Sequence, residues 1–108
     1  MVTARRFDVM LVQLDPTRGS EIRKTRPCLV ISPDEMNESL RTAVVAPMST
    51  QGRAYPWRVS LSFEGKDGLV LLDQIRTVDE QRLLKHLGRL DSSVARKVLD
   101  TIAEMFAP

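Results

Sequence analysis

Two apolar runs near the start of the chain are separated by a charged loop. Residues 7–14 are almost continuously apolar and rich in β-forming types, and a turn-forming cluster of Asp, Pro and Gly over 15–19 follows them. A second apolar run covers 28–31, directly after Pro27, and proline is tolerated as the first residue of a strand. The pattern predicts two strands with the polar residues 20–26 between them.

Strict alternation over 57–63 is the clearest strand pattern in the chain. One face carries Trp57, Val59, Leu61 and Phe63, and the other face is polar, which predicts a half-buried strand with Trp57 in the core. Residues 64–68 are expected to turn the chain. Shorter apolar runs predict further strands over 42–48, 69–72, 75–78 and 86–90.

Two helices are expected. Ser32 at the N-cap, Pro33 at the first helical position and Glu35 two residues later form a capping-box pattern for a helix of about one turn. Asp91 and the two serines after it can cap a final helix. That helix is amphipathic, and its apolar stripe should dock on the sheet or on a second subunit. The stripe consists of Val94, Val98, Leu99, Ile102, Met105 and Phe106.

These elements predict an α+β chain that is mostly β. Several short strands with charged loops favour a small, strongly curved antiparallel β-barrel with short helices and a C-terminal amphipathic helix. The 108 residues suit one domain with one core, so we expect a single domain over 1–108.

Composition narrows the chemistry that is available. The chain has 16 Lys and Arg against 14 Asp and Glu, a net charge of +2, which is small for a dedicated duplex-binding domain. One cysteine, Cys28, and one histidine, His86, exclude a zinc-type cluster and a pair of catalytic histidines, so no metal or cofactor is expected. No apolar run is long enough to span a bilayer or to serve as a secretory signal, which predicts a cytoplasmic protein.

The loop between the first two strands carries the most concentrated charge. Glu21, Arg23, Lys24 and Arg26 lie within six residues. Such a loop is most often a solvated hairpin tip. Arg26 is placed differently, because it directly precedes Pro27 at the base of the loop, where its planar fork of donors could face a phosphate.

Four separated motifs in this chain resemble those of the MazF/PemK toxins of bacterial toxin–antitoxin systems. They are residues 15–21 (DPTRGSE), 26–32 (RPCLVIS), 49–51 (STQ) and 72–78 (LDQIRTV). The resemblance implies an SH3-like barrel that forms a homodimer, cuts single-stranded RNA at short sequences without metal, and is silenced by a labile MazE-like antitoxin. A glycine that is typical of the family before the first strand is Phe7 in this chain.

The resemblance also implies a set of site residues. The key arginine of the family falls on Arg26, its catalytic hydroxyl, usually threonine, on Ser49, and its loop glutamate on Glu21. Five further positions match residues that line the RNA groove or the dimer centre of the family: Ser20, Thr50, Gln51, Gln74 and Arg76.

This residue list suits cleavage in which the 2′-hydroxyl of the RNA is the nucleophile. We hypothesise that Arg26 stabilises the transition state, Ser49 orients the phosphate and Glu21 assists proton transfer, leaving 2′,3′-cyclic phosphate and 5′-hydroxyl ends. One alternative is a non-catalytic toxin that resembles the gyrase-poisoning CcdB proteins, although those lack the Arg-Pro loop motif. A second alternative is an SH3-like interaction module whose loop cations bind acidic partners.

Two other residues have simpler interpretations. Cys28 lies in an apolar strand and is expected to be a small core residue rather than a nucleophile. His86 is expected at the surface or at an interface.

Overall fold

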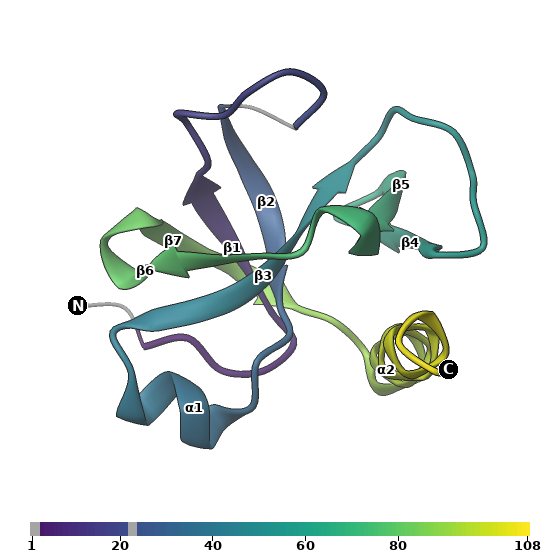
Figure 1. The fold of residues 1–108 in the computed structure, drawn as a ribbon. Helices are drawn as coiled ribbons and strands as arrows, with labels where there is room; N and C mark the ends of the chain where they lie inside the picture. The colour runs from purple at the N-terminus through teal and green to yellow at the C-terminus, as the bar shows by residue number, and fades with distance from the viewer. Residues whose placement is uncertain (1–2, 22–23) are drawn as a thin grey trace.

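Antiparallel strands make up most of the molecule, and two helices flank them (Figure 1). The computed structural model describes residues 3–21 and 24–108. Its strands are β1 (Asp8–Gln13), β2 (Thr25–Val30), β3 (Thr42–Ser49), β4 (Arg58–Phe63), β5 (Lys66–Leu71), β6 (Arg76–Asp79) and β7 (Leu83–Arg89). The helices are α1 (Asp34–Ser39) and α2 (Ser92–Met105), with short 3-10 turns at Leu72–Gln74 and Glu80–Arg82.

The sheet is curled because β3 belongs to two parts of it. The strand order is β4-β5-β3-β2-β1-β7, and β6 also pairs with β3. The first half of β3 pairs with β6, as Val45 does with Arg76, whereas its last residue, Ser49, pairs with Leu69 of β5. The result is a half-barrel with a C-terminal helix, which confirms the predicted fold class (Figure 1).

The apolar parts of β1 and β2 are buried on both faces, which explains why the sequence there is continuously apolar. On one face, Val9 and Leu29 belong to a core that β4, β5 and α2 complete. On the other face, Met10 and Cys28 belong to a second core with residues of β3, β6 and β7. The prediction that Cys28 is a core residue is confirmed, since it is fully buried.

Helix α2 begins as its sequence predicts. The Asp91 carboxylate accepts hydrogen bonds from the backbone N–H groups of Ser93 and Val94, at 3.0 and 3.1 Å. Val98 on its apolar stripe is fully buried against the sheet. Phe106, the last residue of the predicted stripe, follows the end of the helix and is 75% exposed.

The capping box predicted for α1 is wrong. Ser32 does not cap the helix, because its hydroxyl bonds to the side chain of Asn37 and accepts from the N–H of Val44. The N-cap position is Pro33, without a side-chain cap. The serine therefore fastens the helix to β3 instead.

The core position predicted for Trp57 is also wrong. Trp57 is 39% exposed and stacks on Tyr55, with ring centroids 4.9 Å apart. The chain joins the sheet only at Arg58, so Trp57 still belongs to the preceding loop. The buried face of the alternating pattern consists instead of Val59 and Leu61.

The start of β1 is tied to the other end of the chain. The buried Asp8 carboxylate accepts hydrogen bonds from the N–H of Arg5 at 2.9 Å and from Nη1 of Arg89 at 3.1 Å. Nε2 of His86 lies 3.3 Å from the same carboxylate, and the His86 side chain is half exposed, as predicted. Phe7, which the resemblance aligns with a glycine, has φ 72°, a left-handed conformation that favours glycine.

Candidate active site

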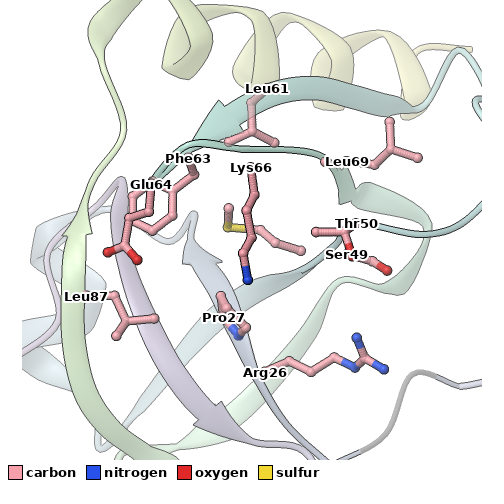
Figure 2. A pocket seen from close by; sticks show the side chains of 12 residues that line it. Arg26, Pro27, Ser49, Thr50, Leu61, Phe63, Glu64, Lys66, Leu69 and Leu87 are labelled. Atoms are coloured by element: carbon pink, nitrogen blue, oxygen red, sulfur yellow. The ribbon is translucent and has the colours of Figure 1, made fainter.

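Arg26 and Ser49 come together because their strands are neighbours. Strands β2 and β3 pair through Cys28 and Pro47, and continuing this register by two residues brings Arg26 level with Ser49. Both side chains line one pocket of about 280 Å³, and Figure 2 shows them on the same side of it. We call this the Arg26 pocket. Its volume is slightly below the roughly 300 to 1,000 Å³ of ligand pockets, which suits one group of a larger flexible substrate.

The Ser49 hydroxyl is held by the backbone that follows it. Its Oγ accepts a hydrogen bond from the N–H of Gln51 at 3.1 Å. A hydroxyl that accepts such a bond keeps its own proton for donation to a substrate oxygen. Thr50 also lines the pocket, whereas the exposed Gln51 does not.

The far wall of the pocket comes from the β4–β5 hairpin. Glu64 and Gly65 form its two-residue turn with φ of 51° and 76°, and positive φ at both positions matches the twist of the flanking strands. Lys66 therefore begins β5 rather than lying in a five-residue turn, and it lines the pocket together with Gly68.

Glu21 lies in a second hollow rather than in the Arg26 pocket. This hollow, which we call the Glu21 hollow, is lined by Ser20, Glu21, Asp73, Gln74, Ile75 and Arg76. The Glu21 carboxylate accepts a hydrogen bond from the N–H of Arg18 at 3.0 Å. Arg76 donates from Nη1 to the carbonyl of Leu14 at 3.1 Å, which fixes its guanidinium beside the end of β1. Apart from Gln51, which lines neither, the predicted site residues are thus divided between the Arg26 pocket and the Glu21 hollow.

A bidentate ion pair between Arg58 and Asp73 connects the loop after Ser49 to the Glu21 hollow. Arg58 donates from Nε and Nη2 to the two carboxylate oxygens of Asp73, at 3.0 and 2.9 Å. Its Nη1 also donates to the carbonyl of Arg53 in the loop. The hydrogen bond from Arg58 lowers the pKa of Asp73, and the same bond raises the pKa of Arg58.

Cys28 carries no reactive thiolate. Burial raises the pKa of its thiol to about 12, although the positive charges of Arg76 and Arg26 oppose this shift. A thiol that stays protonated at neutral pH is a poor nucleophile. Both arginines lie close enough to Cys28 for their charges to act on it.

The remaining candidates are metal-ligating clusters and the other cations of the β1–β2 loop. In the described part of the chain, no cluster of three or more His, Cys, Asp and Glu residues could hold a metal ion. Lys24 is exposed and has φ 68°, and Arg23, another cation expected in the loop, lies outside the described residues.

Sequence reasoning missed Lys66, Glu64 and Gly68 in the Arg26 pocket. It assigned them all to one turn. The available signal was the dipeptide Glu64-Gly65 between two apolar runs, which is compatible with a two-residue hairpin and would have placed Lys66 and Gly68 on a strand.

The fold and the pocket define a class: a small, curled, mostly β protein with a C-terminal helix and a polar pocket between adjacent strands. The model of the PemK-like, MazF-like toxins of type II toxin–antitoxin systems matches residues 5–106. The chain therefore belongs to this family. No helix in its described part is long and apolar enough to cross a membrane.

Several curated proteins are similar in sequence. The endoribonuclease EndoA of Bacillus subtilis is 36% identical over 100 residues, which are 87% of this chain and 86% of that protein. The endoribonuclease PemK of Escherichia coli is 36% identical over 104 residues, covering 91% of this chain and 78% of that protein. The endoribonuclease toxin MazF of Escherichia coli K12 is 38% identical over 71 residues, covering 66% of this chain and 64% of that protein. The match with this last relative thus spans less than two thirds of its length.

Solved structures of low sequence identity share the fold. MazF from Deinococcus radiodurans superposes with a TM-score of 0.85 at 24% identity, over 97% of each chain. A chain of a MazE–MazF structure from the same organism superposes with a TM-score of 0.80 at 21% identity, covering 99% of this chain and 98% of that one.

Proposed function

We propose that this chain is the endoribonuclease toxin of a type II toxin–antitoxin system and cuts single-stranded RNA at short specific sequences without a metal ion. The observation that carries the proposal is the joint placement of Arg26 and Ser49 in one pocket, from adjacent strands of the family fold. Relatives named as endoribonucleases support the same activity.

The proposed reaction is a transesterification within the RNA. The 2′-oxygen attacks the adjacent phosphorus, a base takes the 2′-proton, and the bond from phosphorus to the 5′-oxygen breaks as that oxygen gains a proton. The products are a 2′,3′-cyclic phosphate and a 5′-hydroxyl. The enzyme supplies no nucleophile, which is consistent with a chain whose only cysteine is buried.

Each site residue has a proposed role. The guanidinium of Arg26 stabilises the extra negative charge of the pentacovalent phosphorane, and the Ser49 hydroxyl donates to a non-bridging oxygen. Glu21 assists proton transfer from the Glu21 hollow, so the RNA would pass over both regions. Residues that contact the rest of the RNA or the dimer centre are Ser20, Thr50, Gln51, Gln74 and Arg76.

The proposed assembly and partners follow from family membership. The working form is a homodimer, which supplies a longer groove than 108 residues provide alone. A MazE-like antitoxin inhibits it, as the solved MazE–MazF structures suggest. Both proteins act in the cytoplasm, where the RNA is.

The test is incubation of the purified protein with a long RNA in EDTA, followed by sequencing of the RNA ends. Cuts at a common short sequence with 5′-hydroxyl ends are expected. Arg26→Ala should lose about 100-fold or more of the activity while keeping its melting temperature. The control is Arg96→Ala, an exposed arginine on α2.

Other results would point elsewhere. Intact RNA together with trapped gyrase–DNA complexes would support a CcdB-like toxin, and intact RNA without them would leave an interaction module. Full activity of Arg26→Ala would remove Arg26 from the mechanism.

A further inference from the structure

Lys66 brings a second cation into the Arg26 pocket, from a different strand. Its side chain lines the pocket with Arg26 and Ser49. Figure 2 shows its amine projecting into the pocket toward the wall that carries Arg26 and Pro27. None of the ion pairs within the described residues includes Lys66, so its charge is not neutralised by a neighbouring carboxylate.

The β4–β5 hairpin fixes the backbone position of Lys66. Lys66 pairs with Phe63 directly across the two-residue turn, so its backbone is part of the sheet from the first residue of β5. A lysine on a paired strand moves only its side chain, and its amine can adjust to a substrate atom.

Gly68 lets the strand that carries Lys66 pack closely against Ser49. Residues two apart on a strand face the same side, so Gly68 faces the same side of β5 as Lys66. A Cβ at Gly68 would lie 2.8 Å from the carbonyl oxygen of Ser49, closer than real contacts allow. The missing side chain therefore lets β5 lie against Ser49, which brings Lys66 and Ser49 to the same pocket.

The charges of the pocket favour a phosphate. Arg26 and Lys66 contribute two positive charges, and Glu64, the one carboxylate in the lining, lies toward Leu87 in Figure 2 and away from Ser49. An ammonium has three donors and no acceptor, so it suits a phosphate oxygen as a point charge. The pocket as a whole is cationic.

We infer that Lys66 binds a backbone phosphate of the RNA next to the one held by Arg26 and Ser49. This inference rests on the proposed function. It adds a contact from β5, so the substrate backbone is held from three strands: β2, β3 and β5.

The experiment measures the salt dependence of binding. A fluorescent 2′-O-methyl oligonucleotide pool, which cannot be cleaved, is titrated with wild type, Lys66→Gln, Lys66→Arg and Lys97→Gln between 50 and 200 mM salt. Each phosphate contact to a single strand adds about 0.7 to the slope of log affinity against log salt. Lys66→Gln should therefore lose about 0.7 of the slope, a change of about 2.6-fold across this range. Its affinity at 50 mM should fall by up to about fivefold.

The other variants control the measurement. Lys66→Arg should keep the slope, and Lys97→Gln, which removes an exposed lysine of α2, should match wild type. Equal slopes for Lys66→Gln and Lys97→Gln would overturn the inference, whether or not the protein cleaves RNA. If wild type binds with the expected Lys66 effect but never cuts RNA, the proposed activity fails and the phosphate contact stands. If wild type does not bind, both fail.

Discussion

The Arg26 pocket and the Glu21 hollow are built in different ways. Arg26 and Ser49 lie on paired strands, and Gly68 seats a third strand against them. Ser20 and Glu21 lie in an exposed loop, opposite a 3-10 turn that carries Gln74. Groups that must meet a reacting phosphorus need positions accurate to a fraction of an ångström, which strands provide, whereas groups that select a sequence tolerate loops. Arg26 and Ser49 are thus held by paired strands, whereas Ser20 and Glu21 are held by a loop.

The strongest test of the difference between the Arg26 pocket and the Glu21 hollow is the substitution Ser49→Ala. It removes a donor from the Arg26 pocket and should lower kcat/KM by about 10- to 100-fold, the scale of one hydrogen bond to a charged group. Ser49→Thr keeps the hydroxyl and should retain most activity. Initial rates on a short RNA measure this, and an Ala variant as active as the Thr variant would show that Ser49 does not contact the phosphate.

Gly68→Ala tests the seating of β5. The added methyl would meet the Ser49 carbonyl at 2.8 Å, so the strands must separate. We expect a loss of about 2 kcal/mol in the free energy of unfolding, typical of overpacking, and reduced cleavage. Urea denaturation measures the first effect, with Ser62→Ala on exposed β4 surface as the control. A variant as stable as that control would mean that the strands accommodate a side chain there.

Glu21→Gln tests the Glu21 hollow. Because the carboxylate lies outside the Arg26 pocket, we expect a loss of no more than about tenfold, smaller than a full general-base effect. The pH–rate profile should lose its acidic limb if Glu21 accepts the proton. An unchanged profile would leave Glu21 a binding residue only.

Asp73→Asn tests the link between the regions. The pKa of Asp73 is lowered in the folded protein, so the stabilisation is present above its unfolded pKa of roughly 3.9 and disappears as the pH falls through the folded pKa. At pH 7 the variant should be less stable by about 1 kcal/mol, the scale of a partly exposed pair. Its urea midpoint should approach that of wild type in strong acid. A constant difference at every pH would assign the effect to packing.

The strands were predictable because their apolar runs reflect burial. Two-sided burial of β1 and β2 gives continuous runs, and one-sided burial of β4 gives alternation. Trp57 was misplaced because alternation does not reveal where a strand leaves the sheet. The cap at Ser32 was mistaken because its hydroxyl bonds to Asn37 and Val44, and Val44 lies 12 residues away.

The site was predictable only in its residue types. The motifs indicate Arg26 and Ser49, and adjacent strands bring them into one pocket. Nothing in the local sequence shows that Glu21 faces a different hollow, because that depends on how β6 pairs with β3. Lys66 was missed for a similar reason: its place in the pocket comes from the register of β5 against Ser49.

The pairing of β1 with β7 has a consequence for the order in which the molecule is made. Asp8 contacts Arg89, 81 residues later, and β7 covers the edge of β1 that β2 leaves open. During synthesis this edge has no partner until residues 83–89 leave the ribosome. The sheet therefore becomes complete only once residues 83–89 have been made, so a growing chain has Arg26, Ser49 and Lys66 well before it has the fold that holds them.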